Sequence, residues 1–129
     1  MASSRTMKVL SAGDVSTLLV SNWIDLNRVN KCSIEIRETG TPSGTITLEG
    51  TNQPNGANEG TPDPSVTPVT LAAGAITPAL PATGGAAVNY IGGLVIPGGQ
   101  AQCRWVRLRQ TAGGAGAANV WVHFSGDGL

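Results

Sequence analysis

The sequence predicts an all-β protein: a single-domain β-sandwich, jelly-roll-like, with about eight or nine short strands and long Gly/Pro-rich loops. Two stretches, Ser33 to Gly50 and Trp105 to Gly126, follow one plan of apolar/polar alternation that is broken by a tip of small residues. The 18 glycines and 8 prolines suit short strands joined by turns. A chain of 129 residues is long enough for one core and gives no reason for a second domain.

The first quarter of the chain predicts a short arm and three strands. Residues 1–5 are small and polar, so we expect a flexible N-terminal arm there and a single β-sandwich domain over residues 6–129. An apolar strand is expected over 6–10, followed by a turn at Gly13 and Asp14. Residues 15–20 and 22–26 favour strands over a helix, because Val, Ser, Thr and Asn dominate.

Each of the two matched stretches is interpreted as a β-hairpin whose apolar side chains alternate. The residues expected to point into the core are Ile34, Ile36, Ile46 and Leu48 in the first stretch and Val106, Leu108, Val120, Val122 and Phe124 in the second. The side chains on the opposite face of each strand should then be exposed to solvent.

The region between the two stretches predicts loops and two further strands. Residues 51–68 contain four prolines, so we expect a long exposed loop, which either reaches a neighbouring molecule or is disordered. A short strand is expected over 69–71, a surface segment over 72–85, and a strand over 86–96 that ends at Pro97.

Charge and apolar patterning exclude several classes of function. Eight basic residues balance eight acidic ones, and only 12% of the chain is charged, so no global field attracts nucleic acid or an anionic membrane. The N-terminal residues show no apolar segment of a secretory signal, and no stretch approaches a membrane span. We therefore expect the protein to be made in the cytoplasm and not to be exported. We also expect it to have no nucleic-acid, membrane or small-molecule partner.

The chain contains few residues of the types that usually act in catalysis or bind metals. His123 is the single histidine, and it lies in an alternating strand with no nucleophile motif beside it, so we expect no enzyme activity. Cys32 and Cys103 fit buried thiols better than a disulfide. A zinc site is disfavoured because there is no C-x-x-C motif, and no cofactor or metal is expected.

One exposed group of side chains is expected. On the hairpin model, Trp105, Arg107 and Arg109 form an outward row, and Trp121 and His123 lie on the neighbouring strand. Tryptophan and arginine are enriched at the energetic centres of protein interfaces, so Trp105, Arg107, Arg109 and Trp121 are candidate protein-interface residues. Two alternatives remain open. The tryptophans could pack inside the protein, or the group could bind a ligand or single-stranded nucleic acid.

A resemblance adds to this interpretation. The segments W-I-D-L, S-I-E-I-R-E-T-G-T-P-S-G-T-I-T-L-E-G-T-N and R-W-V-R-L-R-Q-T-A-G-G-A-G-A-A-N-V-W-V occur in that order, with a Pro/Gly loop between the last two. In this pattern the chain resembles small virion proteins of tailed bacteriophages, of the capsid decoration or cement type. The similarity extends over most of the chain from Trp23 to Phe124.

The resemblance implies a jelly-roll-like structural protein of the virion. Such a protein would sit on the outer surface of the capsid and staple neighbouring major capsid proteins against internal DNA pressure, often as a dimer or trimer. Binding energy alone, multiplied over many copies, would stabilise the shell. The alternative is a β-sandwich module of a tail, baseplate or fibre, with carbohydrate as a further candidate ligand.

Overall fold

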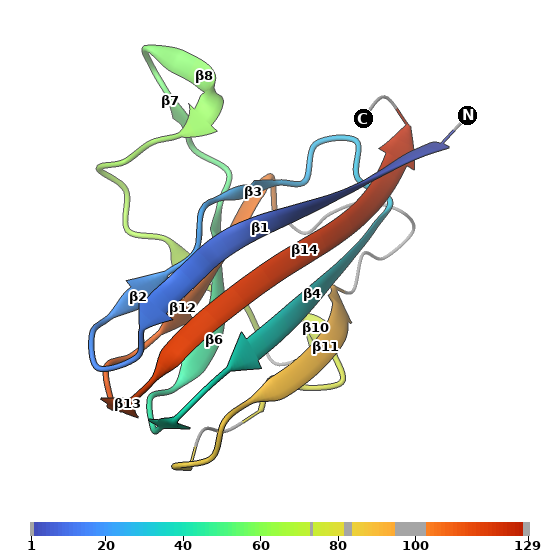
Figure 1. Ribbon diagram of the computed structural model, residues 1–129. Helices are drawn as coiled ribbons and strands as arrows, with labels where there is room; N and C mark the ends of the chain where they lie inside the picture. The colour runs from blue at the N-terminus through green and yellow to red at the C-terminus, as the bar shows by residue number, and fades with distance from the viewer. Residues whose placement is uncertain (1, 73, 82–83, 95–102, 128–129) are drawn as a thin grey trace.

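The computed structural model describes residues 2–72, 74–81, 84–94 and 103–127 (Figure 1). Over these residues the chain forms strands, turns and bends and no helix, so the prediction of an all-β protein is confirmed. Within the same residues there is consequently no apolar helix long enough to cross a bilayer.

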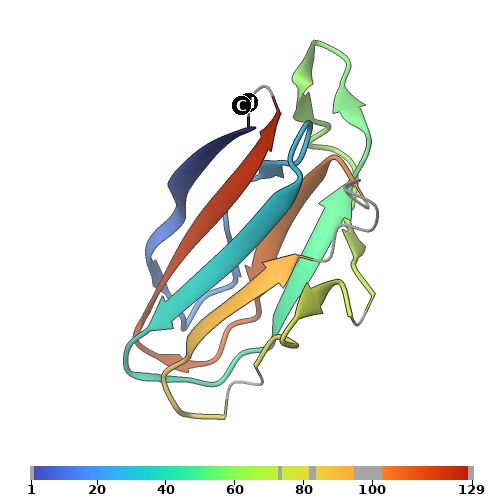
Figure 2. The same ribbon diagram turned by 90° about the vertical axis from the view of Figure 1, so that its right-hand side faces the viewer.

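Two antiparallel sheets form the body of the molecule, which is β-sandwich-like (Figures 1 and 2). Sheet A runs in the order β1 (Ala2–Asp14), β14 (Ala117–Asp127), β4 (Lys31–Glu38), β11 (Asn89–Leu94) and β10 (Ile76–Thr77). Sheet B runs β2 (Leu19–Val20), β12 (Trp105–Gln110), β6 (Ile46–Thr51) and β9 (Val69–Thr70), and β3 (Ile24–Asp25) also pairs with β12. Strand lengths vary more than the expected set of short strands, since β1 has 13 residues and β9 has two.

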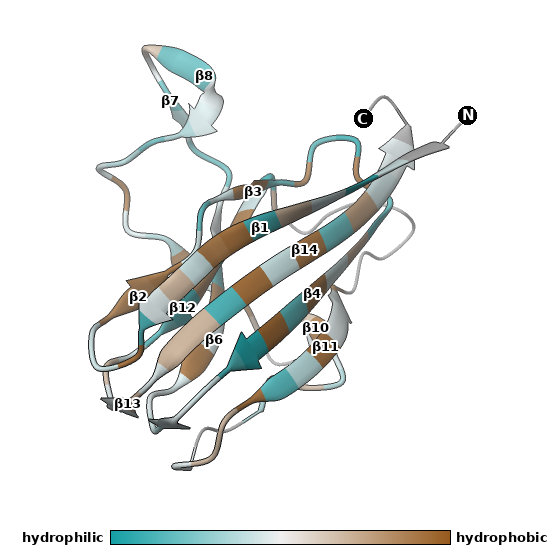
Figure 3. Cartoon of the chain, in the orientation of Figure 1, coloured by the Kyte–Doolittle hydropathy of each residue, from teal (hydrophilic) through white to brown (hydrophobic). Residues whose placement is uncertain are grey.

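The core lies between the two sheets, because alternate residues of both turn inward. Hydropathy changes in bands along β14 and β4, as period-two alternation requires (Figure 3). All the core positions expected from the two matched stretches are buried: Ile34, Ile36, Ile46, Leu48, Val106, Leu108, Val120, Val122 and Phe124. The strand alternation therefore predicted the inward faces correctly.

The two matched stretches are not hairpins, and this expectation is wrong. β4 belongs to sheet A while β6 belongs to sheet B, and β12 and β14 are divided between the sheets in the same way. Each stretch is an arch that crosses from one sheet to the other. Both legs of an arch still turn their apolar side chains into the core, which is why alternation alone does not distinguish an arch from a hairpin.

The two arches pair with each other along their whole length. β4 pairs with β14, the tip strand β5 (Thr41–Pro42) with β13 (Gly114–Ala115), and β6 with β12. One register runs unbroken around the bend, because the two residue numbers of every Cα pair, from Cys32↔Phe124 to Thr51↔Trp105, add to the same total. The paired arches join the two sheets at one end of the sandwich.

Glycines at the arch tips permit this close pairing. A Cβ at Gly44 would lie 1.8 Å from the carbonyl oxygen of Thr111, and one at Gly114 would lie 2.0 Å from that of Thr41. Gly114 also has a φ of +77°, which disfavours any other residue. The small residues of the two tips are thus a packing requirement of one arch against the other.

The N-terminal residues lie in the sheet, where the sequence suggested a flexible arm. β1 begins at Ala2, and its first residues pair with the end of β14, from Ala2↔Asp127 to Arg5↔Phe124. The two ends of the described chain consequently lie side by side (Figure 2).

The expected loop over residues 51–68 contains a small hairpin. β7 (Pro54–Asn55) pairs with β8 (Asn58–Pro62), and the pair projects from one end of the sandwich (Figure 1). Most of this hairpin is exposed, including Glu59. The prolines lie at the ends of the short ladder and not in a central strand, as their missing N–H requires.

Candidate interaction surfaces

The four candidate interface residues divide between the two outer faces of the sandwich. Trp105, Arg107 and Arg109 alternate with the core residues Val106 and Leu108 on β12, and so lie on the outer face of sheet B. Trp121 lies on β14, on the outer face of sheet A. The expected adjacency of Trp121 to the β12 row is wrong, because it depended on β12 and β14 pairing as a hairpin.

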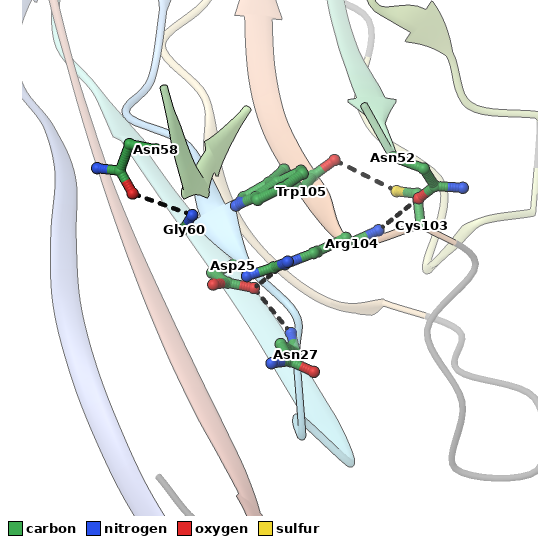
Figure 4. A network of polar contacts seen from close by, with 8 residues as sticks. All are labelled: Asp25, Asn27, Asn52, Asn58, Gly60, Cys103, Arg104 and Trp105. Carbon is green, nitrogen blue, oxygen red and sulfur yellow. Dashed lines mark hydrogen bonds and ion pairs between the residues drawn. The ribbon is translucent and has the colours of Figure 1, made fainter. Parts of the chain in front are cut away.

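Trp105 is buried against its own chain. Only 1% of the residue is exposed, and the guanidinium of Arg104 stacks 4.3 Å from the centre of an indole ring (Figure 4). Arg104 is held in turn, since its Nε lies 3.5 Å from Oδ1 of Asp25 and its backbone N–H donates to Oδ1 of Asn52 at 2.7 Å. Trp105 is thus packed inside the protein, which was one of the alternatives that the sequence left open.

Arg107 is engaged by Glu49 of the neighbouring strand β6 and by Trp23, which directly precedes β3. Its Nε donates to Oε1 of Glu49 at 2.6 Å, and its guanidinium lies 4.4 Å from the ring centre of Trp23. Both charged side chains are largely withdrawn from water, with 23% and 8% of their surfaces exposed. A charge neutralised and stacked in this way has little left to offer a partner, and loss of either member would leave the other charge poorly solvated.

Of the two arginines on β12, Arg109 has the guanidinium that is more available to a partner. It is half-buried and makes no ion pair with any other described residue. Its cross-strand neighbours are Val20 and Thr47, and 40% of Val20 is exposed. Arg109 and Val20 therefore leave a small mixed surface at this edge of sheet B.

Trp121 lies in a row of four side chains that crosses sheet A. The register places Lys8 of β1, Trp121 of β14, Glu35 of β4 and Ile91 of β11 side by side, and we call these four the Trp121 row. The ammonium of Lys8 lies 5.0 Å from the centre of a Trp121 ring, and Ile91 is 62% exposed. An aromatic and a large aliphatic side chain thus share one solvent-facing row.

Polar residues border the Trp121 row on both sides. On one side are Asn119, Arg37 and Asn89, which the register places next to one another. Arg37 lies 3.1 Å from Glu35 of the row. On the other side, His123 Nδ1 and the hydroxyl of Thr6 share a hydrogen bond of 2.7 Å. The row is therefore mixed, since the charged Lys8 and Glu35 alternate with Trp121 and Ile91, and a protein interface taken as a whole is about as polar as the rest of the surface.

Lys8 and Ile91 were not among the residues that the sequence singled out. Both lie in strands expected from the sequence, but nothing local indicates which residues of β1 and β11 share a row with Trp121. That information is in the pairing of strands far apart along the chain. The only local signal concerns Ile91, a large apolar residue at an outward position in a short strand.

An apolar cleft of about 240 Å³ opens between the edges of the two sheets. Its lining comes from β6, β9, β10 and the segments beside them, and includes Leu48, Leu71, Ile76 and Leu80. No ionisable side chain lines it among the described residues. The cleft therefore presents no group suited to acid–base chemistry or to binding a charged ligand.

The ionisable and thiol groups are dispersed over the described part of the chain. Those residues contain no group of three or more His, Cys, Asp or Glu side chains close enough to hold a metal ion. Both cysteines are free, and burial raises the pKa of the Cys32 thiol to about 12. A thiol with so high a pKa is protonated and unreactive at neutral pH.

No protein-family model, curated protein or solved structure matches this chain.

Proposed function

We propose that this protein is a jelly roll, a form of β-sandwich. A jelly roll is a long antiparallel hairpin of eight strands rolled into two sheets. Its nested pairs have counterparts here: β1 with β14, β2 and β3 with β12, β4 with β11, and β6 with β9. The additional pairs β4–β14 and β6–β12 are those that rolling creates. This strand order is the observation that carries the proposal.

We infer from this fold a non-enzymatic structural role in a bacteriophage virion. Jelly rolls are common in capsid proteins and lectins, both of which act by binding. The resemblance of segments between Trp23 and Phe124 to capsid decoration proteins points to the head of the particle. The protein would be made in the host cytoplasm, bind the outer capsid surface, and staple neighbouring major capsid proteins.

The Trp121 row is the surface that suits this binding best. Trp105 and Arg107 are used within the protein, so of the four candidate residues Trp121 is the one with an aromatic side chain still open to a partner. Ile91 adds exposed apolar area on the far side of Glu35 in the same row, and the bordering Asn119, Arg37 and Asn89 offer hydrogen bonds at a rim. The partner would be the major capsid protein or a second copy in a dimer or trimer.

Two measurements test the proposal. The first counts copies of the protein in purified virions by quantitative mass spectrometry against the major capsid protein. A decoration protein gives a stoichiometry comparable with the capsid protein, and a few copies per particle would contradict that role.

The second measurement compares capsid binding by the substitutions Ile91→Asp and Val69→Asp. Both residues are exposed aliphatic side chains of edge-proximal strands, but Ile91 is in sheet A and Val69 in sheet B. Loss of capsid binding by Ile91→Asp alone would support the Trp121 row as the interface. Loss in Val69→Asp alone would place the interface on sheet B.

A tail, baseplate or fibre module is the second candidate function. The observation in its favour is the same face, because an indole bordered by asparagine and arginine side chains also suits the apolar and hydroxyl faces of a sugar. A few copies located at the tail, together with binding to host-surface glycans, would support this alternative over the decoration protein.

A further inference from the structure

Two buried polar side chains meet where the arches turn between the sheets. Glu38 ends β4 of sheet A and is 4% exposed, and Gln110 ends β12 of sheet B and is fully buried. Nε2 of Gln110 donates to Oε2 of Glu38 at 2.9 Å. The two residues hold matching places in the two sequence motifs, R-E-T-G and R-Q-T-A-G.

The remaining oxygens of this pair lack donors. Oε1 of Glu38 and Oε1 of Gln110 are both buried and have no hydrogen-bond partner. If Glu38 were ionised, both oxygens would be acceptors only, and each would carry the cost of an unmet buried acceptor. One proton placed on Oε1 of Glu38 removes both deficits, since that oxygen becomes a donor and the amide oxygen gains one.

We propose that Glu38 is a neutral carboxylic acid in the folded protein and forms a two-hydrogen-bond clasp with Gln110, which ties sheet A to sheet B at the arches. The amide N–H donates to Oε2, and the acid O–H on Oε1 donates to the amide oxygen. The proton comes from solvent, because the carboxyl of the unfolded chain is ionised at neutral pH.

No charge on the surrounding strands opposes this assignment. Beside Glu38 are the apolar Ala118, which is its cross-strand partner on β14, and Val88, whose carbonyl accepts its backbone N–H. Among the described side chains, these charged and titratable ones on the neighbouring strands occupy outward positions: Asp14, Lys31, Glu35, Arg37, Glu49, Arg107, Arg109 and His123. The titratable side chains of Cys32 and Tyr90 pack on the core side of sheet A, but burial raises the pKa of each, so both are uncharged at neutral pH. Desolvation accordingly raises the pKa of Glu38 above its usual 4.5, against the lowering effect of the Gln110 hydrogen bond.

The clasp makes the junction of the two sheets sensitive to pH. A carboxyl whose folded pKa is raised contributes its full stabilisation below the unfolded pKa and loses it as pH rises through the folded value. The contribution of the clasp to the free energy of unfolding is therefore complete below about pH 4.5 and declines above it, because the unfolded chain is then stabilised by ionisation of the carboxyl. This response is opposite to that of a carboxylate held in an ion pair.

Glu38→Gln is the sharpest test, because glutamine reproduces the neutral acid with a permanent donor. We expect the urea midpoint of the variant to match the wild type at about pH 4 and to exceed it increasingly towards about pH 7. The control is Glu35→Gln on the same strand, whose exposed carboxyl should not reproduce this divergence. A Glu38→Gln midpoint that runs parallel to the wild type over this range would overturn the proposal.

A second measurement needs no variant. The carbon-13 shift of the Glu38 carboxyl, followed by NMR in the wild-type protein, should keep the value of a protonated acid at neutral pH. A carboxylate shift at neutral pH would mean that Glu38 is ionised in the folded state and that ordered water fills the site, and would also overturn the proposal. Neither experiment involves a capsid, so each outcome is independent of the proposed function.

Discussion

Arg107 and Glu49, which face each other across β12 and β6, form a 2.6 Å ion pair that is covered on one side by the indole of Trp23. The pair joins one leg of the second arch to one leg of the first. The loss of stability on replacing one of the two residues therefore measures how much the pairing of the arches depends on side chains in sheet B.

The substitution Arg107→Ala should destabilise the protein by about 2 kcal/mol, below the value for a fully buried pair because Arg107 keeps some contact with water. The loss arises because the Glu49 carboxylate, 8% exposed, is left without its partner. Urea unfolding at neutral pH measures it. The matched control is Arg37→Ala, whose partner Glu35 is 36% exposed and whose loss should cost under about 1 kcal/mol. Equal effects would mean that burial of the Arg107 pair contributes nothing.

Replacing the two tryptophans of the second arch should have different consequences. Trp105→Ala removes a side chain that is 1% exposed and should lower the free energy of unfolding by about 3–5 kcal/mol. Trp121→Ala removes a half-buried side chain on the outer face of sheet A and should cost about 1 kcal/mol. Chemical denaturation of both variants checks the ranking. If Trp121→Ala proved the more damaging, Trp121 would have a structural role and its place in an interface would have to be reconsidered.

The arch tips should not tolerate a single added methyl group. Gly44→Ala would place a Cβ 1.8 Å from the Thr111 carbonyl oxygen, and the backbone shift required should cost about 1–3 kcal/mol. Gly56→Ala serves as the control, since a Cβ there has no heavy atom within 4 Å. Thermal unfolding of the two variants compares them. An unchanged melting temperature for Gly44→Ala would show that the tips can separate without loss.

The two cysteines should differ in their reactivity towards a thiol reagent. Cys32 lies in the core with a pKa of about 12, so almost no thiolate exists at about pH 8 and labelling should require unfolding. Cys103 is half-buried, with a pKa raised less by burial, and should react first in the native protein. Mass spectrometry of the labelled peptides distinguishes the sites. Rapid labelling of native Cys32 would contradict its burial.

The strand alternation is sufficient to predict the inward faces of the two sheets. It places residues such as Ile34 and Val106 in the core, because two-residue periodicity is a local property of the chain. The pairing of β4 with β14 is not predictable in this way. An arch and a hairpin have the same alternation, and the choice between them depends on which partner offers the better packing.

The candidate interface depends on tertiary contacts in the same way. Trp105 and Trp121 both stand at outward positions of alternating strands, so the sequence does not distinguish them. Arg104 covers Trp105 on sheet B, and Trp121 lies on sheet A, at the opposite side of the molecule. Both facts depend on residues brought together from distant parts of the chain.

The sequence by itself determined that this protein is built of β-strands, which side chains enter its core, and that its tips are made of small residues. Periodicity and backbone sterics act locally, so these properties can be derived from neighbouring residues alone. The tertiary structure decided that the two arches pair in one register, that Trp121 faces away from Arg107, and that Glu38 meets Gln110 in the interior. Those relationships depend on contacts between residues more than 50 positions apart, such as Arg107 and Glu49, and only the packed sandwich creates them.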